Sequence, residues 1–392
     1  MTSNIRNLIL EEEAMMIEIR RFLHKYPEES FREIQTTNYI MEKLEQLDIP
    51  HHALLPTGLA AEIKGKHPGK TVALRADIDA LEVEEKNEFP YKSKVKGLMH
   101  ASGHDAHTAM LLTAAKVLSQ MKDDIHGSIK LIFQPGEVIL GGAKQFVDQG
   151  VLDDVDNIFG LHIWSGAPSK TVSCPTGPYF ASADSFSVQF IGESGHAAQP
   201  QRAVDATIMM TQYINDIQTI ISRNTRATSP VVITVGKAVS GSHFNIISGQ
   251  SLIEGTVRTF DNEIRDFVCE RLEHMAEKVA EMHGGQVEFD YQKITDPLVN
   301  DGKSSKLVKD IVGSYFGEEA YHEMVPTTIS DDFSFYLNQT PGAYATIGSS
   351  NSPETSYPHH SDRFDIDESA LVVGAELHVR YALEYLKQNQ QI

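Results

Sequence analysis

The spacing of apolar residues along the chain predicts a regular alternation of helices and strands. Apolar residues recur at helical spacing over residues 4–25 until Pro27, and a second helix is expected over 31–47. Short apolar runs bounded by polar residues then predict buried strands separated by helical segments. The strands are expected at 71–75, 129–133 and 157–161, and the helices at 105–121 and 142–150. This alternation indicates an α/β fold with a mostly parallel sheet flanked by helices.

The pattern changes between residues 183 and 292, where strands and helices follow one another in the order βαββαβ. This order is typical of an independent α+β sandwich. We therefore predict a main domain of residues 1–182 and 293–392, with an inserted lid and dimerisation domain of residues 183–292. The remaining elements are expected as strands at 185–191, 230–237, 251–260, 286–291 and 343–347, and as helices at 203–223, 262–283, 304–316 and 368–388.

A cluster of histidines stands just before and within the helix expected at 105–121. His100, His104 and His107 lie within eight residues, and imidazole is the commonest metal ligand in proteins. We interpret the cluster as a metal site, because several buried imidazoles without a ligand would leave hydrogen bonds unmade. Two alternatives stay open: these three histidines form a separate zinc site, or Ser102 acts as a nucleophile although the G-x-S-x-G motif is absent.

Other reactive side chains follow the predicted strands. Asp77 and Asp79 come after the first strand, Glu137 after the second, and His162 directly after the third. Ligands bind outside the carboxyl ends of parallel strands, so these side chains are expected in one crevice.

Composition narrows the function classes. The chain has 392 residues and a net charge of −20, which disfavours nucleic acid and anionic membranes as partners. Its two cysteines, Cys174 and Cys269, are far apart and form neither a disulfide framework nor a thiolate zinc motif. The sequence lacks a signal peptide and an apolar run of membrane-spanning length, so we expect a cytoplasmic protein.

Ordered motifs over nearly the whole chain resemble the metal-dependent amidohydrolases of the M20 peptidase group, in the branch that hydrolyses N-acyl amino acids, hippurate and auxin conjugates. The motifs that carry this resemblance lie at residues 20–28, 74–81, 99–109, 133–135, 160–162, 195–198, 255–258, 332–334 and 360–364.

The resemblance implies a two-metal site. The bridging cysteine of that branch is Ser102 here, and one ion takes the histidines that match His104 and His162. The second ion takes a glutamate, which is Val138 here, and the histidine that matches His360. His360 is chosen over His359 because it directly precedes Ser361, as in the family motif.

The resemblance also implies the remaining roles. Glu137 matches the general base, and Asp79 matches the carboxylate that orients a metal ligand. His196 and Asn245 match lid residues that reach the scissile carbonyl across a dimer interface, and Arg258 matches a group that binds the substrate carboxylate. A homodimer is expected, because an inserted sandwich exposes an edge strand that a second copy can cover.

Two ligand positions depart from the family pattern. A serine hydroxyl stays neutral where a metal-bound cysteine is an anion, and valine offers no ligand atom. We therefore expect at most one divalent ion, Mn or Zn, held by His104 and His162 with Ser102 or water. Glu137 or Asp105 is the candidate substitute ligand.

Three functions remain open from the sequence. The first is metal-dependent hydrolysis of the amide bond of N-acyl amino acids or related small amides, with Glu137 as base and His196 steadying the oxyanion. The second is a catalytically weakened or inactive binding or regulatory protein, because Ser102 and Val138 replace ligands. The third is a weak single-metal enzyme with altered metal or substrate preference.

Overall fold

The structure is a computed structural model that describes residues 4–390. Residues 1–3 lie outside this range. The expectation that the chain has no signal peptide rests partly on these residues. The chain forms two compact units. Unit 1 consists of the chain up to Gly177, Val299–Val325 and the chain from Asp332 onward, and unit 2 consists of Pro178–Leu298 and Pro326–Asp331. No helix within residues 4–390 is long and apolar enough to cross a membrane.

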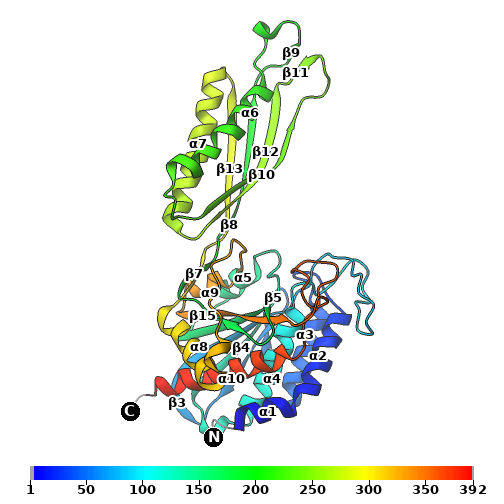
Figure 1. Cartoon of the computed structure of the whole chain (residues 1–392), viewed down its shortest axis with the longest axis vertical. Coiled ribbons are helices and arrows are strands. Elements are labelled where there is room, and N and C mark those ends of the chain that lie inside the picture. The colour runs from blue at the N-terminus through cyan, green and yellow to red at the C-terminus, as the bar shows by residue number, and fades with distance from the viewer. Residues whose placement is uncertain (1–3, 391–392) are drawn as a thin grey trace. The chain divides into compact units, whose positions relative to one another are not determined.

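Unit 1 contains a mixed sheet surrounded by helices (Figure 1), which confirms the predicted fold class. Within the described residues its strands follow the order β1-β2-β4-β3-β5-β15-β6, and β4, β3, β5 and β15 at its centre run parallel. The strands are β1 (His51–Ala53), β2 (Leu59–Lys64), β3 (His67–Asp77), β4 (His126–Gln134), β5 (Asn157–Pro168), β6 (Val172–Ser173) and β15 (Gly342–Ser350).

The helices of unit 1 cover this sheet. They are α1 (Ile5–Glu11), α2 (Glu13–Lys25), α3 (Ile34–Gln46), α4 (His104–Ser119), α5 (Gly142–Asp148), α8 (Gly302–Tyr315), α9 (Ser334–Leu337) and α10 (Ala370–Gln388), with short turns η2 (Lys122–Asp124) and η5 (Glu318–Ala320). Helices α4 and α10 pack closely on each other, because a side chain at Gly374 would place its Cβ only 2.0 Å from the Met110 sulfur. Apolar residues from these helices and from the sheet form one continuous core.

The first helical segment differs from the prediction. Instead of one helix over 4–25, the chain forms α1 and α2, which are separated at Glu12. The Glu12 N–H bonds to the carbonyl of Ile9, three residues back, so the helical ladder tightens there and restarts.

Unit 2 has the predicted βαββαβ order and its own apolar core. Its antiparallel sheet follows the order β10-β12-β8-β13 and packs against α6 and α7 (Figure 1). The elements are β8 (Ala183–Ile191), β9 (Gly195–His196), η3 (Pro200–Arg202), α6 (Ala206–Asp216), η4 (Ile220–Asn224), β10 (Val231–Ser240), β11 (Ile246–Ile247), β12 (Gln250–Thr259), α7 (Asn262–His283) and β13 (Gln286–Thr295). The chain passes between the two units through β7 (Gly177–Phe180) and β14 (Leu298–Asn300).

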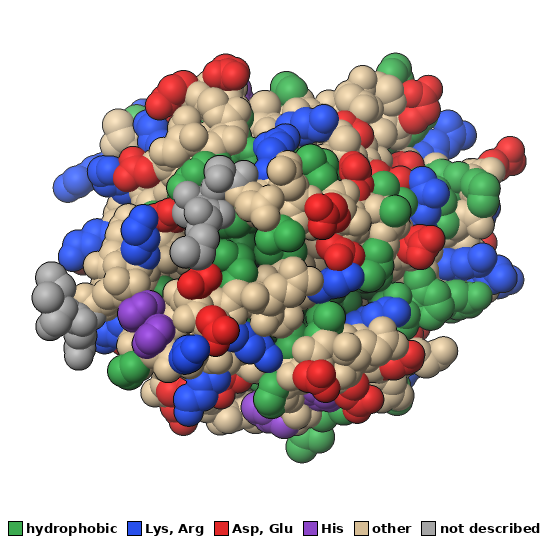
Figure 2. Space-filling view, turned by 90° about the horizontal axis from the view of Figure 1, so that it is seen from below, with side chains coloured by type: hydrophobic (Ala, Val, Ile, Leu, Met, Phe, Trp, Pro, Cys, Tyr) green, Lys and Arg blue, Asp and Glu red, His purple; other side chains and the backbone are tan. Residues whose placement is uncertain are grey.

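The surface carries both signs of charge despite the net charge of −20. Figure 2 shows one face, on which acidic and basic side chains are interspersed among apolar ones over the described residues. This mixture of charges is typical of the surface of a globular protein.

Candidate metal centre

Three parallel strands and one helix bring the predicted site residues of unit 1 together. Asp77 is the last residue of β3, Glu137 follows β4, and His162 lies within β5. Helix α4 begins at His104, directly after Gly103, whose φ of +94° is a conformation that glycine adopts at little cost. The parallel sheet and this tight helix start therefore place acids and imidazoles at one edge, as the sequence predicts.

His104 has one ring nitrogen engaged and the other available. Its Nδ1 donates to the Asp79 carbonyl at 2.9 Å and to the Asp79 carboxylate at 3.1 Å. Its buried Nε2 has no hydrogen-bond partner among the described residues and lies 3.6 Å from Glu137 Oε2. A histidine whose Nδ1–H is held by a carboxylate and whose Nε2 is unbonded has the arrangement of a metal ligand.

The electrostatic surroundings of His104 favour positive charge at this place. Burial alone would lower the pKa of His104, but the nearby carboxylates of Asp77, Asp79 and Glu137 outweigh it and raise the pKa to about 10. Three buried acids around one imidazole create a negative potential that a divalent cation would neutralise. The residues present therefore fit a cation at the Nε2 side of His104.

His162 presents a second ring nitrogen to the same place. Its Nδ1 donates to the Ile163 carbonyl at 2.6 Å, which leaves Nε2 facing the Ser102 hydroxyl at 3.4 Å. Burial, followed by the charge of neighbouring histidines, lowers the pKa of His162 and keeps the ring neutral, the form in which imidazole binds metal. The structure thus brings His104, His162 and Ser102 together, as expected from the sequence.

His107 belongs to the same group but is already occupied. The nitrogens of His104, His107 and His162 lie within 4.8 Å of one another. Yet His107 Nδ1 donates to Asp77 at 2.5 Å, and its Nε2 accepts the N–H of Ile163 at 2.9 Å. Both nitrogens of His107 are therefore satisfied by protein groups, which supports a structural role rather than ligation.

Asp79 is held in place from three sides. Its Oδ2 accepts the Ser30 hydroxyl at 2.7 Å and the Val138 N–H at 2.9 Å, while its Oδ1 accepts from His104. These bonds fix the carboxylate and, through it, the orientation of the His104 ring. This geometry is that of an orienting carboxylate next to a ligand.

The second ligand pair of the family pattern does not join the three-histidine group among the described residues. The half-buried Val138 side chain and the exposed His360, whose φ is +68°, both line one hollow of unit 1. His359 instead lies beside His162, with ring centroids 5.1 Å apart, and burial lowers the pKa of His359 to about 3. The structure therefore places His359, rather than His360, next to His162.

Asp105, a candidate substitute ligand, is bound elsewhere. Its Oδ2 accepts from Arg20 at 3.0 Å and from His24 at 2.8 Å, in a fully buried contact between α2 and α4. Burial raises the pKa of Asp105, but the opposing charges of Arg20 and His24 prevail and hold it well below its ordinary value. Asp105 therefore anchors the start of α4.

Sequence reasoning missed the buried arginine beneath the site. Arg75 donates to Asp77 at 2.7 Å, to Asp332 at 3.1 Å and to Gln134 at 2.8 Å. All four side chains are buried. A charged residue inside the apolar strand Thr71-Val72-Ala73-Leu74-Arg75 was the available signal, because a buried charge requires partners.

The remaining predicted residues lie in unit 2. His196 on β9 is exposed and pairs with Ile246 of β11, and the Asn245 carbonyl accepts the N–H of Ala197 at 3.2 Å. His196 and Asn245 thus lie close together, His196 on β9 and Asn245 directly before β11. Arg258 on β12 is half-buried and donates to the Ser330 hydroxyl at 2.5 Å.

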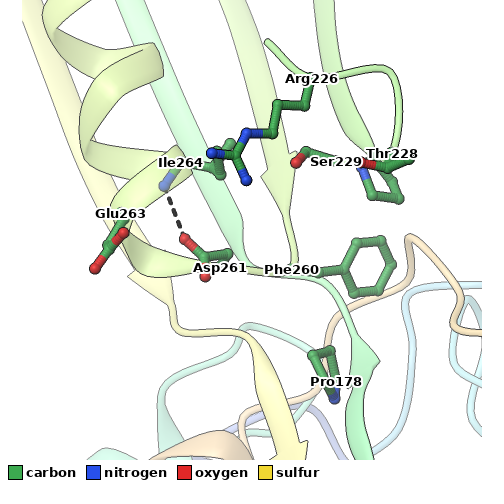
Figure 3. Close-up of a pocket in the computed structure, with 9 residues that line it drawn as sticks. Pro178, Arg226, Thr228, Ser229, Phe260, Asp261, Glu263 and Ile264 are labelled. Atoms are coloured by element: carbon green, nitrogen blue, oxygen red, sulfur yellow. Dashed lines mark hydrogen bonds between the residues drawn. The ribbon is translucent and has the colours of Figure 1, made fainter.

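Unit 2 also contains a hollow of about 420 Å³ near the start of α7 (Figure 3). Phe260, Ile264 and Pro178 form apolar parts of its lining, and Arg226 and Asp261 form polar parts. The Asp261 carboxylate accepts the Ile264 N–H at 2.9 Å and so already caps the helix that it precedes. These residues differ from all of the predicted site residues.

Known proteins resemble this chain over most of its length. N-acetyl-L-cysteine deacetylase of Bacillus subtilis (strain 168) is 38% identical over 380 residues, which cover 97% of this chain and 90% of that protein. N-acyl-L-amino acid amidohydrolase of Geobacillus stearothermophilus is 39% identical over 300 residues, which cover 76% of this chain and 80% of that protein.

A solved structure and a family description agree with these relatives. The crystal structure of the Bacillus subtilis YXEP protein, described as a dinuclear metal binding peptidase from the M20 family, matches with a TM-score of 0.85 and 32% identity, covering 96% of this chain and 98% of that one. Residues 73–384 match the description "Peptidase family M20/M25/M40". The chain therefore belongs to peptidase family M20/M25/M40 and is a hydrolase of that family.

Proposed function

We propose that this protein hydrolyses the amide bond of N-acyl amino acids or related small amides with the help of one bound divalent metal ion. The two relatives described above are named for the removal of an acyl group from an amino acid. The observation that carries the proposal is the unbonded His104 Nε2, which lies 3.6 Å from the Glu137 carboxylate. A candidate ligand and a candidate base thus stand side by side.

His104 and His162 would hold the ion, with the Ser102 hydroxyl or water beside them. A bound Mn or Zn ion supplies Lewis-acid polarisation of a carbonyl group. We propose one ion rather than two, because Val138 carries no ligand atom and Ser102 contributes no negative charge.

Glu137 is the proposed general base. Its carboxylate takes a proton from the attacking water as the water oxygen bonds to the amide carbon. Glu137 then gives this proton to the amide nitrogen, the carbon–nitrogen bond breaks, and a carboxylic acid and a free amino acid result. Asp79 keeps the His104 ring oriented throughout.

Residues 183–292, which lie within unit 2, are proposed to act as a lid and dimerisation domain. His196 would steady the oxyanion, Asn245 would contact the scissile carbonyl, and Arg258 would bind the substrate carboxylate. Exposed apolar side chains support an interface between two copies, since Phe244 is 100% exposed and Ile246 is 44% exposed.

We also infer a cytoplasmic location. Cys174 and Cys269 are both free thiols, as in proteins of reducing compartments.

The second candidate function is a binding or regulatory protein with little catalytic power. Ser102 and Val138 favour it, because both weaken the metal site relative to the family pattern. Metal content of protein purified without chelator, measured together with amine release from a panel of N-acetyl and N-benzoyl amino acids, separates the two. Metal near zero without turnover would support the second function and contradict the first.

Glu137→Gln tests the base directly. We expect kcat to fall about 10²- to 10⁴-fold, because the amide of glutamine cannot accept the proton, while metal content stays unchanged. Glu11→Gln, an exposed change at the end of α1, is the control and should leave kcat unaltered. Equal rates for the two variants would exclude Glu137 as the base.

A further inference from the structure

Unit 1 contains a hollow of about 470 Å³ that borders the candidate metal centre. Its apolar lining comes from two segments and consists of Ala80, Leu81, Val83, Val138 and Ile139. A volume of this size lies within the range that small ligands occupy in proteins, roughly 300–1,000 Å³.

Residues that line the hollow are adjacent in sequence, or hydrogen-bonded, to the reactive side chains of the candidate metal centre. Val138 directly follows Glu137, and its N–H donates to Asp79, which orients His104. Ser30, which also lines the hollow, donates to the same oxygen of Asp79 at 2.7 Å. A group bound in the hollow would therefore lie next to the base and the imidazoles.

The chemistry of the lining favours an uncharged, apolar occupant. Ile139 is 53% exposed, and such a large apolar side chain beside a site is available for ligand contact. Of the polar side chains in the lining, Arg32 is paired with Glu29 at 2.9 Å, Glu82 adds a further acid, and His360 adds an imidazole. This acidic rim would repel the carboxylate of an amino acid.

We propose that this hollow binds the hydrocarbon chain of the substrate's acyl group, and that Val138 and Ile139 set the preferred acyl length. The acyl chain is the part of an N-acyl amino acid that has no charge. Valine at position 138, where the family pattern has a metal ligand, then supplies an apolar wall. This inference rests on the proposed function for the identity of the acyl group.

Binding of straight-chain carboxylic acids to the metal-loaded protein tests the inference without requiring turnover. Acetate, butyrate, hexanoate and octanoate are the probes, and calorimetry gives their affinities. We expect affinity to rise about fourfold for each added methylene up to the length that fills the hollow. Affinity that does not change with chain length would overturn the inference.

Variants at the hollow provide the matched comparison. Ile139→Trp should reduce hexanoate affinity at least tenfold and acetate affinity less than twofold, because the indole fills the space that the longer chain needs. Leu55→Trp, at another exposed position of unit 1 (73% exposed), should change neither. Val138→Ala, which enlarges the hollow, should move the best acid to greater length.

Equal effects of Ile139→Trp and Leu55→Trp would place the acyl chain elsewhere and contradict the inference. The outcome is separable from that of the proposed function. Chain-length-dependent binding in a protein without amide hydrolysis supports the hollow and contradicts the enzyme, whereas hydrolysis with length-independent binding does the reverse.

Discussion

At the scale of single residues, the proposal of a single bound ion rests on Ser102 and Val138. Ser102 keeps an oxygen 3.4 Å from His162 Nε2, so it still faces the candidate metal centre. Val138 keeps its backbone bond to Asp79, but its side chain lines an apolar hollow. Neither position therefore supplies the negative charge that would offset the repulsion between two neighbouring cations.

Restoring both residues should therefore restore the second ion. For the double variant Ser102→Cys/Val138→Glu we expect metal content to rise from about one to about two ions per chain, because a thiolate and a carboxylate balance the added charge. Elemental analysis measures this. Val83→Glu, which puts a carboxylate on the same hollow, is the control and should add no ion. An unchanged metal content in the double variant would show that positions 102 and 138 do not face a second ion.

Glu33 is a buried carboxylate that the sequence did not single out. Thr57 donates to one of its oxygens at 2.6 Å, and the Gly136 N–H donates to the other at 3.0 Å. Gly136 directly precedes Glu137, so Glu33 anchors the loop that carries the proposed base. Burial, with the nearby charge of Asp79, raises the pKa of Glu33 from 4.5 to about 7.

This raised pKa predicts a specific pH dependence of stability. The unfolded chain releases the Glu33 proton near pH 4.5, whereas the folded chain keeps it to about pH 7. The contribution of Glu33 is therefore fully present below pH 4.5 and is lost as the pH rises to about 7, by up to about 3 kcal/mol. Urea unfolding of Glu33→Gln should show a smaller decline over this window. Glu45→Gln, at an exposed position, should follow the wild type. An unchanged slope in Glu33→Gln would refute the assignment.

At the scale of elements, helix α4 carries the site because its first turn is clamped to α2. Arg20 donates to Asp105 in α4, and also to Asp365 at 2.7 Å and to Glu368 at 3.0 Å. The charge on Asp105 is thus compensated inside the protein. Since Asp105 follows His104 directly, these bonds also fix the position of His104, the proposed metal ligand.

Arg20→Met should lower the free energy of unfolding by about 3–5 kcal/mol, because it leaves the buried Asp105 without its main countercharge. The neighbouring Arg21 is 46% exposed, pairs with Glu368 and lies 4.7 Å from the centroid of the Tyr91 ring, so Arg21→Met should cost no more than about 1 kcal/mol. Denaturant titration of both variants measures the difference. Equal losses would mean that the buried pair contributes no more than the exposed one.

Helices and strands with a strong period of apolar residues were predictable from the sequence. Elements whose formation depends on tertiary contacts were not. Helix α7 has the predicted bounds, 262–283, because Asp261 caps its start and Gly284 ends it at a φ of +71°. Strand β2 was missed, since Leu59–Lys64 is short and its pairing with β4 is long-range. The contact of His359 with His162 was not predictable either, because the positive φ of the neighbouring His360 is not revealed by a sequence motif.

The site was predictable to a similar degree. His104 stands at the helix start, and Asp79 and Glu137 follow strand ends, so the topology brings them together. His162 was expected directly after a strand but lies within β5, which continues to Pro168. The sequence could not show that both ring nitrogens of His107 are already hydrogen-bonded. One of these bonds comes from the backbone N–H of Ile163, in a strand far away in the sequence. The Arg20–Asp105 clamp likewise joins residues 85 positions apart.

At the scale of the whole molecule, the two units have separate apolar cores, and His104 and His162, the proposed metal ligands, lie in unit 1. Anything that binds the native state alone stabilises the part of the chain that it binds. We therefore expect calorimetry to resolve two unfolding transitions, of which only one depends on metal. At metal concentrations about 100-fold above Kd, the gain is about 2.7 kcal/mol, which raises the midpoint of that transition by roughly 5–10 °C.

Chelator should reverse this shift in the wild type and leave the second transition in place. The double variant His104→Ala/His162→Ala, measured with and without metal, supplies the comparison, because removal of both imidazoles should abolish the metal-dependent shift. Asp266→Asn, an exposed change in unit 2, should leave it intact. Metal that raised both transitions equally, or that still raised the first in the double variant, would place the ion outside the group formed by these two histidines.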